Sequence, residues 1–285
     1  LRSKCSVQLR NVHHPLISAA DPVPMVNPMN KPTIGEGLST AWIVVTDEIF
    51  AEVPHQVSLR FLGRSYCGGS IISDQWVVTA AQCVSYPPNL ITVQAGSVEA
   101  SGGSLHMVAQ IIVHPNYTLN SDRVPISDVA VLMVSPPFKL DTTRYPVPIF
   151  KQDEVAVPGT NAKISGWGVT DENGSTPDFL QVVELPIVSK KSCDEAYQQI
   201  AHLPEEKICA GVPEGGMGTC QGDEGGPVTI GNRLAGIVSW SYGCAKKGYP
   251  AVYTEVAAFS NWISIFVNIR RIQVPNRNIL HTKKL

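Results

Sequence analysis

Short apolar runs alternate with turn residues along most of the chain, from about Val53 to Glu255. Each run has the length of a strand, is rich in Val and Ile, and is bounded by Gly, Pro, Asn or Ser, which is typical of β-strands. The runs read HQVSLRFL, GSIISDQWVVTA, NLITVQAG, HMVAQIIVH, DVAVLMV, AKISGWG, LQVVELPIV, RLAGIVSW and AVYTEV. Many short strands with few helical stretches predict an all-β barrel or sandwich.

The stretch Val256–Arg271 departs from this pattern and has helical periodicity. The apolar residues that share one helical face are Phe259, Trp262, Ile263, Phe266 and Val267. Arg270 and Arg271 would lie in the last turn, where cations interact favourably with the helix dipole. This spacing predicts a C-terminal helix.

The two ends of the chain are poor in core-forming residues. Residues 1–41 contain PVPMVNPMNKP followed by GEGLST, which predicts an extended, partly disordered leader. Residues 42–270 make up the predicted domain, and residues 271–285 a basic C-terminal tail. The chain begins LRSKC, without an initiator Met or the apolar core of a signal peptide. We interpret it as a mature chain or a fragment from which any signal peptide has been removed.

The composition is that of a globular protein, because 44% of the 285 residues are hydrophobic and only 16% are charged. A net charge of −2 gives no electrostatic reason to expect nucleic acid or a membrane surface as a partner. No apolar run approaches the roughly 18 residues that a membrane-spanning helix needs. We therefore expect neither nucleic-acid binding nor membrane insertion.

The chain has seven cysteines, of which Cys5 stands alone and the others lie at or beyond Cys67. No Cys-x-x-Cys pair or Cys/His cluster indicates a metal site, so disulfides are the better interpretation. Disulfides indicate an oxidising, extracellular compartment. Two N-glycosylation sequons, at Asn116 and Asn173, agree with secretion. Spacing alone does not choose the disulfide connectivity, and Cys5 is either free or in an intermolecular bridge.

Three separated segments carry a family likeness. They read VVTAAQC (Val77–Cys83), SDVAVL (Ser127–Leu132) and TCQGDEGGPV (Thr219–Val228), and CGGSII, ISGWG, ICAGVPEGG, GIVSW and GYPAVYTEV lie between and around them. In this order, over about Trp42–Ile269, they resemble the trypsin and chymotrypsin family of serine proteases, and their wording is most like arthropod members. The resemblance implies a chymotrypsin-like fold: two Greek-key β-barrels with a cleft between them and a C-terminal helix.

The resemblance also implies which cysteines pair. The expected disulfides are Cys67–Cys83, Cys193–Cys209 and Cys220–Cys244. The first closes a loop of about 16 residues, which stabilises the fold by roughly 3 kcal/mol on the chain-entropy model.

The catalytic positions of the family are only partly kept. The resemblance places the aspartate at Asp128, which matches, the histidine base at Gln82 and the serine nucleophile at Glu224. A carboxamide has no proton affinity near neutral pH and cannot act as a general base. A carboxylate is larger than a hydroxyl and is already an oxyanion. We therefore expect no catalytic residues and no enzymatic activity.

Glu224 is expected to occupy the site that would hold the oxyanion. The backbone amides there belong to Gly222 and Glu224, and the Glu224 carboxylate is placed to accept both. The simpler alternatives are that Gln82 is a solvated polar residue and Glu224 an ordinary surface charge. Asp128 is expected to be structural, bonded to nearby backbone or to Gln82.

Activation by cleavage is also expected to fail. In the family, a terminus freed after Lys or Arg pairs with an aspartate that matches Asp223 here. That terminus would fall at Trp42 or, with a one-residue gap, at Ile43, so the preceding residue is Ala41 or Trp42. The glycines that follow it in the family are replaced by bulkier residues. The chain is expected to stay uncut and zymogen-like.

The specificity pocket is changed as well. Its base is Gly218, without the carboxylate that selects Lys or Arg, and its walls carry Ser241 and Ala251 where the family usually has glycine. The added atoms should narrow the pocket. Glu99 is the only carboxylate in the shortened loop where the family binds calcium, so we expect no calcium and no other cofactor.

These features together predict a secreted, non-catalytic serine protease homologue. Its rigid scaffold would bind an extracellular protein, such as a protease, a protease substrate or an inhibitor, and act as a modulator or decoy in protease cascades of the immune kind. An N-terminal clip domain is excluded, because residues 1–41 contain only Cys5. The alternative is a hydrolase that uses Asp128 and Glu224 as a carboxylate pair, which no independent motif supports.

Overall fold

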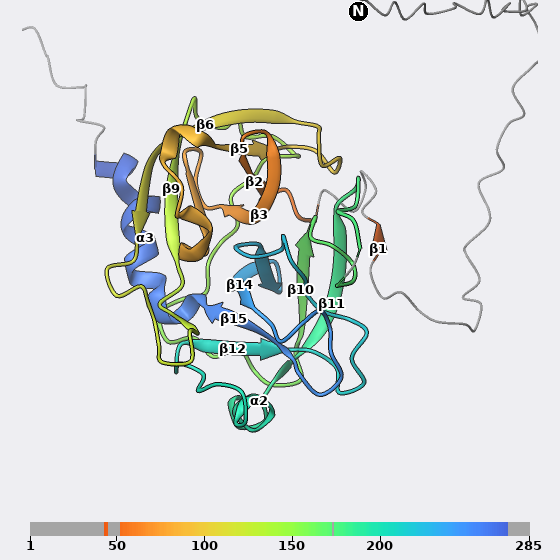
Figure 1. The fold of residues 1–285 in the computed structure, drawn as a ribbon. Coiled ribbons are helices and arrows are strands. Elements are labelled where there is room, and N and C mark those ends of the chain that lie inside the picture. Colours follow the sequence, from red (N-terminus) through yellow and green to blue (C-terminus); the bar gives the residue numbers. More distant parts are fainter. Residues whose placement is uncertain (1–42, 45–51, 173, 273–285) are drawn as a thin grey trace, which may run out of the picture. The chain divides into compact units, whose positions relative to one another are not determined.

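Most of the regular secondary structure of the described residues is antiparallel strand, as the apolar runs predicted (Figure 1). A computed structural model describes residues 43–44, 52–172 and 174–272. The strands are β1 (Ile43–Val44), β2 (Gln56–Phe61), β3 (Arg64–Ile71), β4 (Trp76–Thr79), β5 (Ile91–Ala95), β6 (Ser104–Val113), β7 (Thr118–Leu119), β8 (Pro125–Ile126), β9 (Ala130–Ser135), β10 (Asn161–Gly166), β11 (Gln181–Val188), β12 (Lys207–Ala210), β13 (Pro227–Ile230), β14 (Arg233–Trp240) and β15 (Ala251–Glu255). The helices are α2 (Lys190–Tyr197) and α3 (Val256–Ile272), with short 3-10 helices η1 (Ala81–Val84) and η2 (Pro88–Leu90). The predicted leader with Cys5, the sequon residue Asn173 and the tail from residue 273 lie outside the described residues.

The first half of the chain closes into a barrel with the strand order β2-β3-β4-β9-β6-β5. Its inward-facing residues are Val and Ile at alternate positions, because successive side chains of a strand point to opposite faces. Val57 and Leu59 of β2 and Val77 of β4 are completely buried in its core.

The second half forms a sheet in the order β1-β11-β10-β13-β14-β15-β12. This sheet also closes, because the end of β11 pairs with β12 through Ile187 and Val188. The start of β11 pairs with β1, where Ile43 lies opposite Val182. The two barrels implied by the family resemblance are therefore confirmed.

Helix α3 follows the last strand of the second barrel but packs on the first (Figure 1). Phe259, Ile263 and Phe266 are buried in the first core, and the rings of Phe266 and Trp76 lie 5.1 Å apart. Burial of each such side chain contributes about 1.5–3 kcal/mol. The predicted helix and its apolar face are confirmed, and α3 ends at Ile272, just inside the predicted tail. Within the described part of the chain, no helix has the length and apolarity to cross a membrane.

Helix α2 and the short strands β12 and β13 were not predicted. The Ser189 hydroxyl caps α2 by accepting from the Ser192 amide at 3.1 Å. Lys190 and Asp194 form an i,i+4 ion pair at 2.6 Å on its surface. Both signals are visible in SKKSCDEAY and could have predicted the helix.

The three disulfides are the expected ones: Cys67–Cys83, Cys193–Cys209 and Cys220–Cys244. The first joins β3 to η1 within the first barrel. The second joins α2 to β12, which explains how so short a strand is held in place.

The two barrels touch most closely at Gly225, which has a φ of +80°. A Cβ atom there would lie 2.1 Å from Thr79 Oγ1 and 2.5 Å from the Gly68 carbonyl oxygen, both in the first barrel. Beside this contact, the Gly68 amide donates to the Glu224 carbonyl at 2.7 Å. Gly225 is therefore needed both for its backbone conformation and for the space it leaves.

Replacing Gly225 with alanine should destabilise the protein more than the same change at Gly231. Both residues have positive φ, which costs an alanine about 1–2 kcal/mol, but a Cβ at Gly231 meets no atom within 4 Å. Gly225→Ala adds the overlap with the first barrel, worth about 1–3 kcal/mol more. Urea unfolding of the two variants measures the difference, and equal losses would show that the barrels do not approach as described.

Candidate functional site

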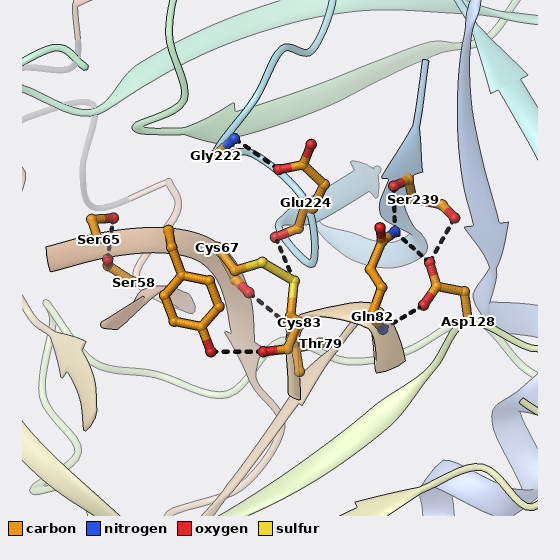
Figure 2. The surroundings of a disulfide bond; sticks show 12 residues. Ser58, Ser65, Cys67, Thr79, Gln82, Cys83, Asp128, Gly222, Glu224 and Ser239 are labelled. Atoms are coloured by element: carbon orange, nitrogen blue, oxygen red, sulfur yellow. Dashed lines mark hydrogen bonds between the residues drawn. A yellow bond between two sulfur atoms is a disulfide. The ribbon is translucent and has the colours of Figure 1, made fainter. Parts of the chain in front are cut away.

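The three catalytic positions, of which Gln82 and Glu224 are altered, come together where the barrels meet (Figure 2). Gln82 lies in η1 and Asp128 just before β9, both in the first barrel. Glu224 lies in the loop that leads into β13 of the second barrel. Figure 2 shows Gln82 turned toward Asp128 and Ser239, and the Glu224 carboxylate turned toward Gly222.

Gln82 and Asp128 are joined by two hydrogen bonds. The Gln82 backbone amide donates to Asp128 Oδ1 at 3.0 Å, and the side-chain Nε2 donates to Asp128 Oδ2 at 2.8 Å. Nε2 also donates to the carbonyl of Ser239 in the second barrel at 2.6 Å. Both hydrogens of the carboxamide are thus used. Gln82 is not the solvated polar residue of the simpler alternative, and Asp128 has the structural partners that we expected.

The Glu224 carboxylate folds back onto its own segment. Its Oε2 accepts the Gly222 amide at 2.7 Å, and the backbone amide of Glu224 also bonds to it. Burial raises the pKa of Glu224, these two hydrogen bonds oppose that rise, and the charge of Asp128 adds to it. A half-buried carboxylate with these contacts is not the plain surface charge of the simpler alternative.

Asp223, next to Glu224, is buried and bonded to backbone. Its Oδ1 accepts the Gly168 amide at 2.8 Å and its Oδ2 the Cys220 amide at 3.1 Å. Cβ atoms at Gly166 and Gly168 would lie only 2.0 and 2.5 Å from this side chain, so glycine is required at both positions. Burial raises the pKa of Asp223 to about 7 against these hydrogen bonds.

None of the ion pairs among the described residues involves Asp223. Ile43 and Val44, at the expected terminus, instead form β1 on the edge of β11. The Gly222 amide nevertheless points at a carboxylate, as it would in a formed oxyanion site. The zymogen-like expectation stays a prediction, and the internal carboxylate of Glu224 binds this amide without a freed terminus.

The residues of the altered specificity pocket lie on the second barrel. Gly218 is buried, and a Cβ atom there would meet Ala245 at 3.2 Å. Ala251 is buried at the start of β15, and the Ser241 hydroxyl donates to the Gly243 carbonyl at 2.6 Å. How far these side chains narrow the pocket stays a prediction.

The sequence analysis missed Lys207, and it did not predict the contact of Ser239, which belongs to the family-like stretch GIVSW. Ser239 donates its hydroxyl to Asp128 Oδ2 at 2.7 Å, and Lys207 lies behind it with 2% of its surface exposed. A period-two pattern in KICA places Lys207 on the same face as the buried Cys209. A lysine on the strand face that also carries a buried, disulfide-bonded cysteine is the signal that could have found it.

Two further expectations concern the surface. Asn116 is exposed and follows β6, as a glycosylated asparagine must be. Over the described residues, no group of three or more His, Cys, Asp or Glu side chains is arranged to hold a metal ion.

Comparison with known proteins gives one consistent result. The sequence model of the trypsin family matches residues 43–263. The chain is 40% identical to trypsin 5G1 of Aedes aegypti over 74% of its length and 79% of the relative's. It is 43% identical to serine protease 1 of Rattus norvegicus over 74% and 83% of the two chains, and 38% identical to trypsin-1 of Astacus astacus over 76% and 96%. Arthropod proteins are thus among the relatives, as the wording of the motifs indicated.

Asp223 should make the protein less stable as the pH rises. The pKa of Asp223 is about 7 in the folded protein, whereas the unfolded chain releases this proton near the ordinary aspartate pKa of 3.8. Stability from this group is therefore greatest in acid and falls as the pH rises between those values, by about 2 kcal/mol from pH 5 to pH 7. Urea unfolding at both pH values should show that Asp223→Asn removes this loss. Asp178→Asn, at an exposed carboxylate, is the control, and equal pH dependence in all three proteins would contradict the assignment.

Proposed function

This chain belongs to the trypsin family of serine proteases, and we propose that it is a secreted, non-catalytic member that binds another protein as a modulator or decoy in an extracellular protease cascade. The observation that carries the proposal is the Glu224 carboxylate on the Gly222 amide at 2.7 Å. In an active protease such amides are free for the charge that develops in the transition state. Here they are bound to a ground-state charge, which gives no acceleration.

Gln82 supports the same conclusion from the side of the base. Its Nε2 hydrogens are directed at Asp128 and Ser239, and an amide group does not accept a proton near neutral pH. In another serine protease, replacing either the base or the nucleophile of the triad alone lowers kcat by about a million-fold. Both are replaced in this chain.

The hydrolase alternative requires Asp128 and Glu224 to act as a free carboxylate pair. Asp128 already accepts from Gln82 and from the Ser239 hydroxyl, and Glu224 accepts backbone amides. Neither carboxylate is left to activate water or to attack a carbonyl, so the binding function is favoured.

Secretion and a protein partner are supported by the scaffold. Three disulfides need an oxidising compartment to form, and Asn116 is exposed for glycosylation. The relatives are proteases, so the surfaces that the family presents around the cleft serve to bind polypeptides. A partner that is itself a protease, a protease substrate or an inhibitor fits this origin.

The modulator role is tested by adding the purified chain to extracellular fluid in which a protease cascade has been triggered. The rate at which the cascade cleaves its substrates should change with dose, and Gln82→Ala should act like the native chain, because binding needs no catalysis. A dose response that disappears with Gln82→Ala, or no effect at any dose, would contradict the role.

The purified protein should hydrolyse no peptide substrate and take up no fluorophosphonate label. The reason is that Gln82 and Glu224 replace the general base and the nucleophile. Fluorogenic peptide panels and gel detection of the label measure this, with an active trypsin as the positive control. Reproducible turnover that Glu224→Ala abolishes would overturn the proposal.

Restoring two residues should not restore the enzyme. Gln82→His with Glu224→Ser recreates the base and the nucleophile, but it removes the carboxylate that holds the Gly222 amide in place. Asp223 would then lie buried without a cation to orient the segment. Small ester substrates should show little turnover, and robust turnover by this double variant would mean that the segment holds its shape unaided.

A fully restored variant is the matched comparison. It adds two sets of substitutions to the double variant. A cleavage site before Ile-Val-Gly-Gly is created by Trp42→Arg, Val45→Gly and Thr46→Gly, and the pocket is reopened by Ser241→Gly with Ala251→Gly. After cleavage, this variant should exceed the double variant by about 100-fold or more, since misplacement alone costs about that much.

A further inference from the structure

Lys207 is a buried lysine with two specific acceptors. It lies on β12 of the second barrel, on the strand face opposite to the core residues Ile208 and Ala210, with 2% of its surface exposed. Its Nζ donates to Thr254 Oγ1 at 2.9 Å and to Ser239 Oγ at 3.2 Å. Lysine is almost never fully buried unless it is paired, so its charge needs a partner.

Both hydroxyls that accept a hydrogen bond from Lys207 also donate one to Asp128. Ser239 Oγ donates to Asp128 Oδ2 at 2.7 Å, and Thr254 Oγ1 donates to the Asp128 backbone carbonyl at 3.0 Å. A hydroxyl has one proton, so each can only accept from Lys207. The direction of every bond is thus fixed, from the ammonium through a hydroxyl to Asp128.

Asp128 and Lys207 carry opposite charges and come from different barrels, and the carboxylates of Glu206 and Glu224 lie near enough to interact with Lys207 and Asp128, respectively. Asp128 is completely buried in the first barrel, and Lys207 is its cation in the second. Burial lowers the pKa of Lys207 to about 8, while the negative charges of Asp128 and Glu206 act to raise it. Lys207 therefore remains mainly an ammonium at neutral pH.

We propose that Lys207 is the counter-charge of Asp128, and that this pair suits the site to a neutral amide at position 82 rather than to an imidazole. Gln82 gives Asp128 two hydrogen bonds and no charge. A histidine in its place would become a second cation on a carboxylate that is already neutralised. Lys207 would disfavour the imidazolium form, on which base catalysis with this aspartate depends. Lys207 is a positioning residue, since it acts through Asp128.

The experiment introduces Gln82→His and follows the new imidazole by NMR titration. The pKa of this imidazole should lie below the ordinary histidine value in the single variant. It should rise by roughly one unit when Lys207→Met is added, because methionine has a similar length to lysine and no charge. Lys191→Met is the control, at a lysine side chain that is 84% exposed on α2, and it should leave the imidazole pKa unchanged. An equal pKa with and without Lys207 would overturn the proposal.

A second measurement serves if the histidine variant does not fold. Asp128→Asn should increase the equilibrium constant for unfolding roughly tenfold more in the native background than in the Lys207→Met background. The reason is that only in the native background does this substitution leave a buried cation, Lys207, unpaired. Equal effects in the two backgrounds would also overturn the pairing. The inference deepens the proposed function, but neither readout depends on turnover. If the protein proved to be an active enzyme and the imidazole pKa still depended on Lys207, the proposed non-catalytic function would be refuted. The pairing of Lys207 with Asp128 would stand.

Discussion

Buried backbone amides need acceptors, and the segment Gly222–Gly226 satisfies this need within a very narrow space between the barrels. The Gly222 amide uses the Glu224 carboxylate, and the Gly225 amide uses the Val238 carbonyl at 2.8 Å. The Glu224 carbonyl in turn accepts from Gly68 of the first barrel. The joint between the barrels is therefore built from the same backbone that shapes the site. A carboxylate at position 224 keeps that backbone bonded whether or not chemistry takes place there.

The acidic side chains of the altered site are held by specific hydrogen bonds. Asp128, Asp223 and Glu224 place three acidic side chains within the contact zone of the barrels, and burial raises the pKa of the last two. Each carboxylate is fixed by hydrogen bonds from backbone or neighbouring side chains rather than left to solvent. Lys207 is a buried cation that is connected to Asp128 through the hydroxyls of Ser239 and Thr254. Each of the three carboxylates is thus hydrogen-bonded by groups of the protein itself.

Sequence reasoning was strongest where the signal is local. Strand-sized apolar runs rich in Val and Ile predicted the barrel strands, and 3.6-residue spacing predicted α3, whereas the hydrogen bonds of Gln82 and Glu224 were expected from the family resemblance. It failed where a side chain depends on distant elements. The Gln82 carboxamide meets the Ser239 carbonyl across 157 positions of sequence, and Lys207 is explained only by strands β12, β14 and β15 meeting beside β9.

The position of α3 links the beginning of the chain to its end. Trp76 and its neighbours in the first barrel are covered by Phe259, Ile263 and Phe266, which are synthesised more than a hundred residues later. At ordinary rates of translation, this face of the first barrel is uncovered for on the order of ten seconds. During that interval it is an apolar surface that can bind a chaperone or aggregate. This face of the first barrel therefore stays uncovered until the second barrel has been synthesised, and a chain truncated before Val256 would keep the strands of both barrels but lose the cover of the first.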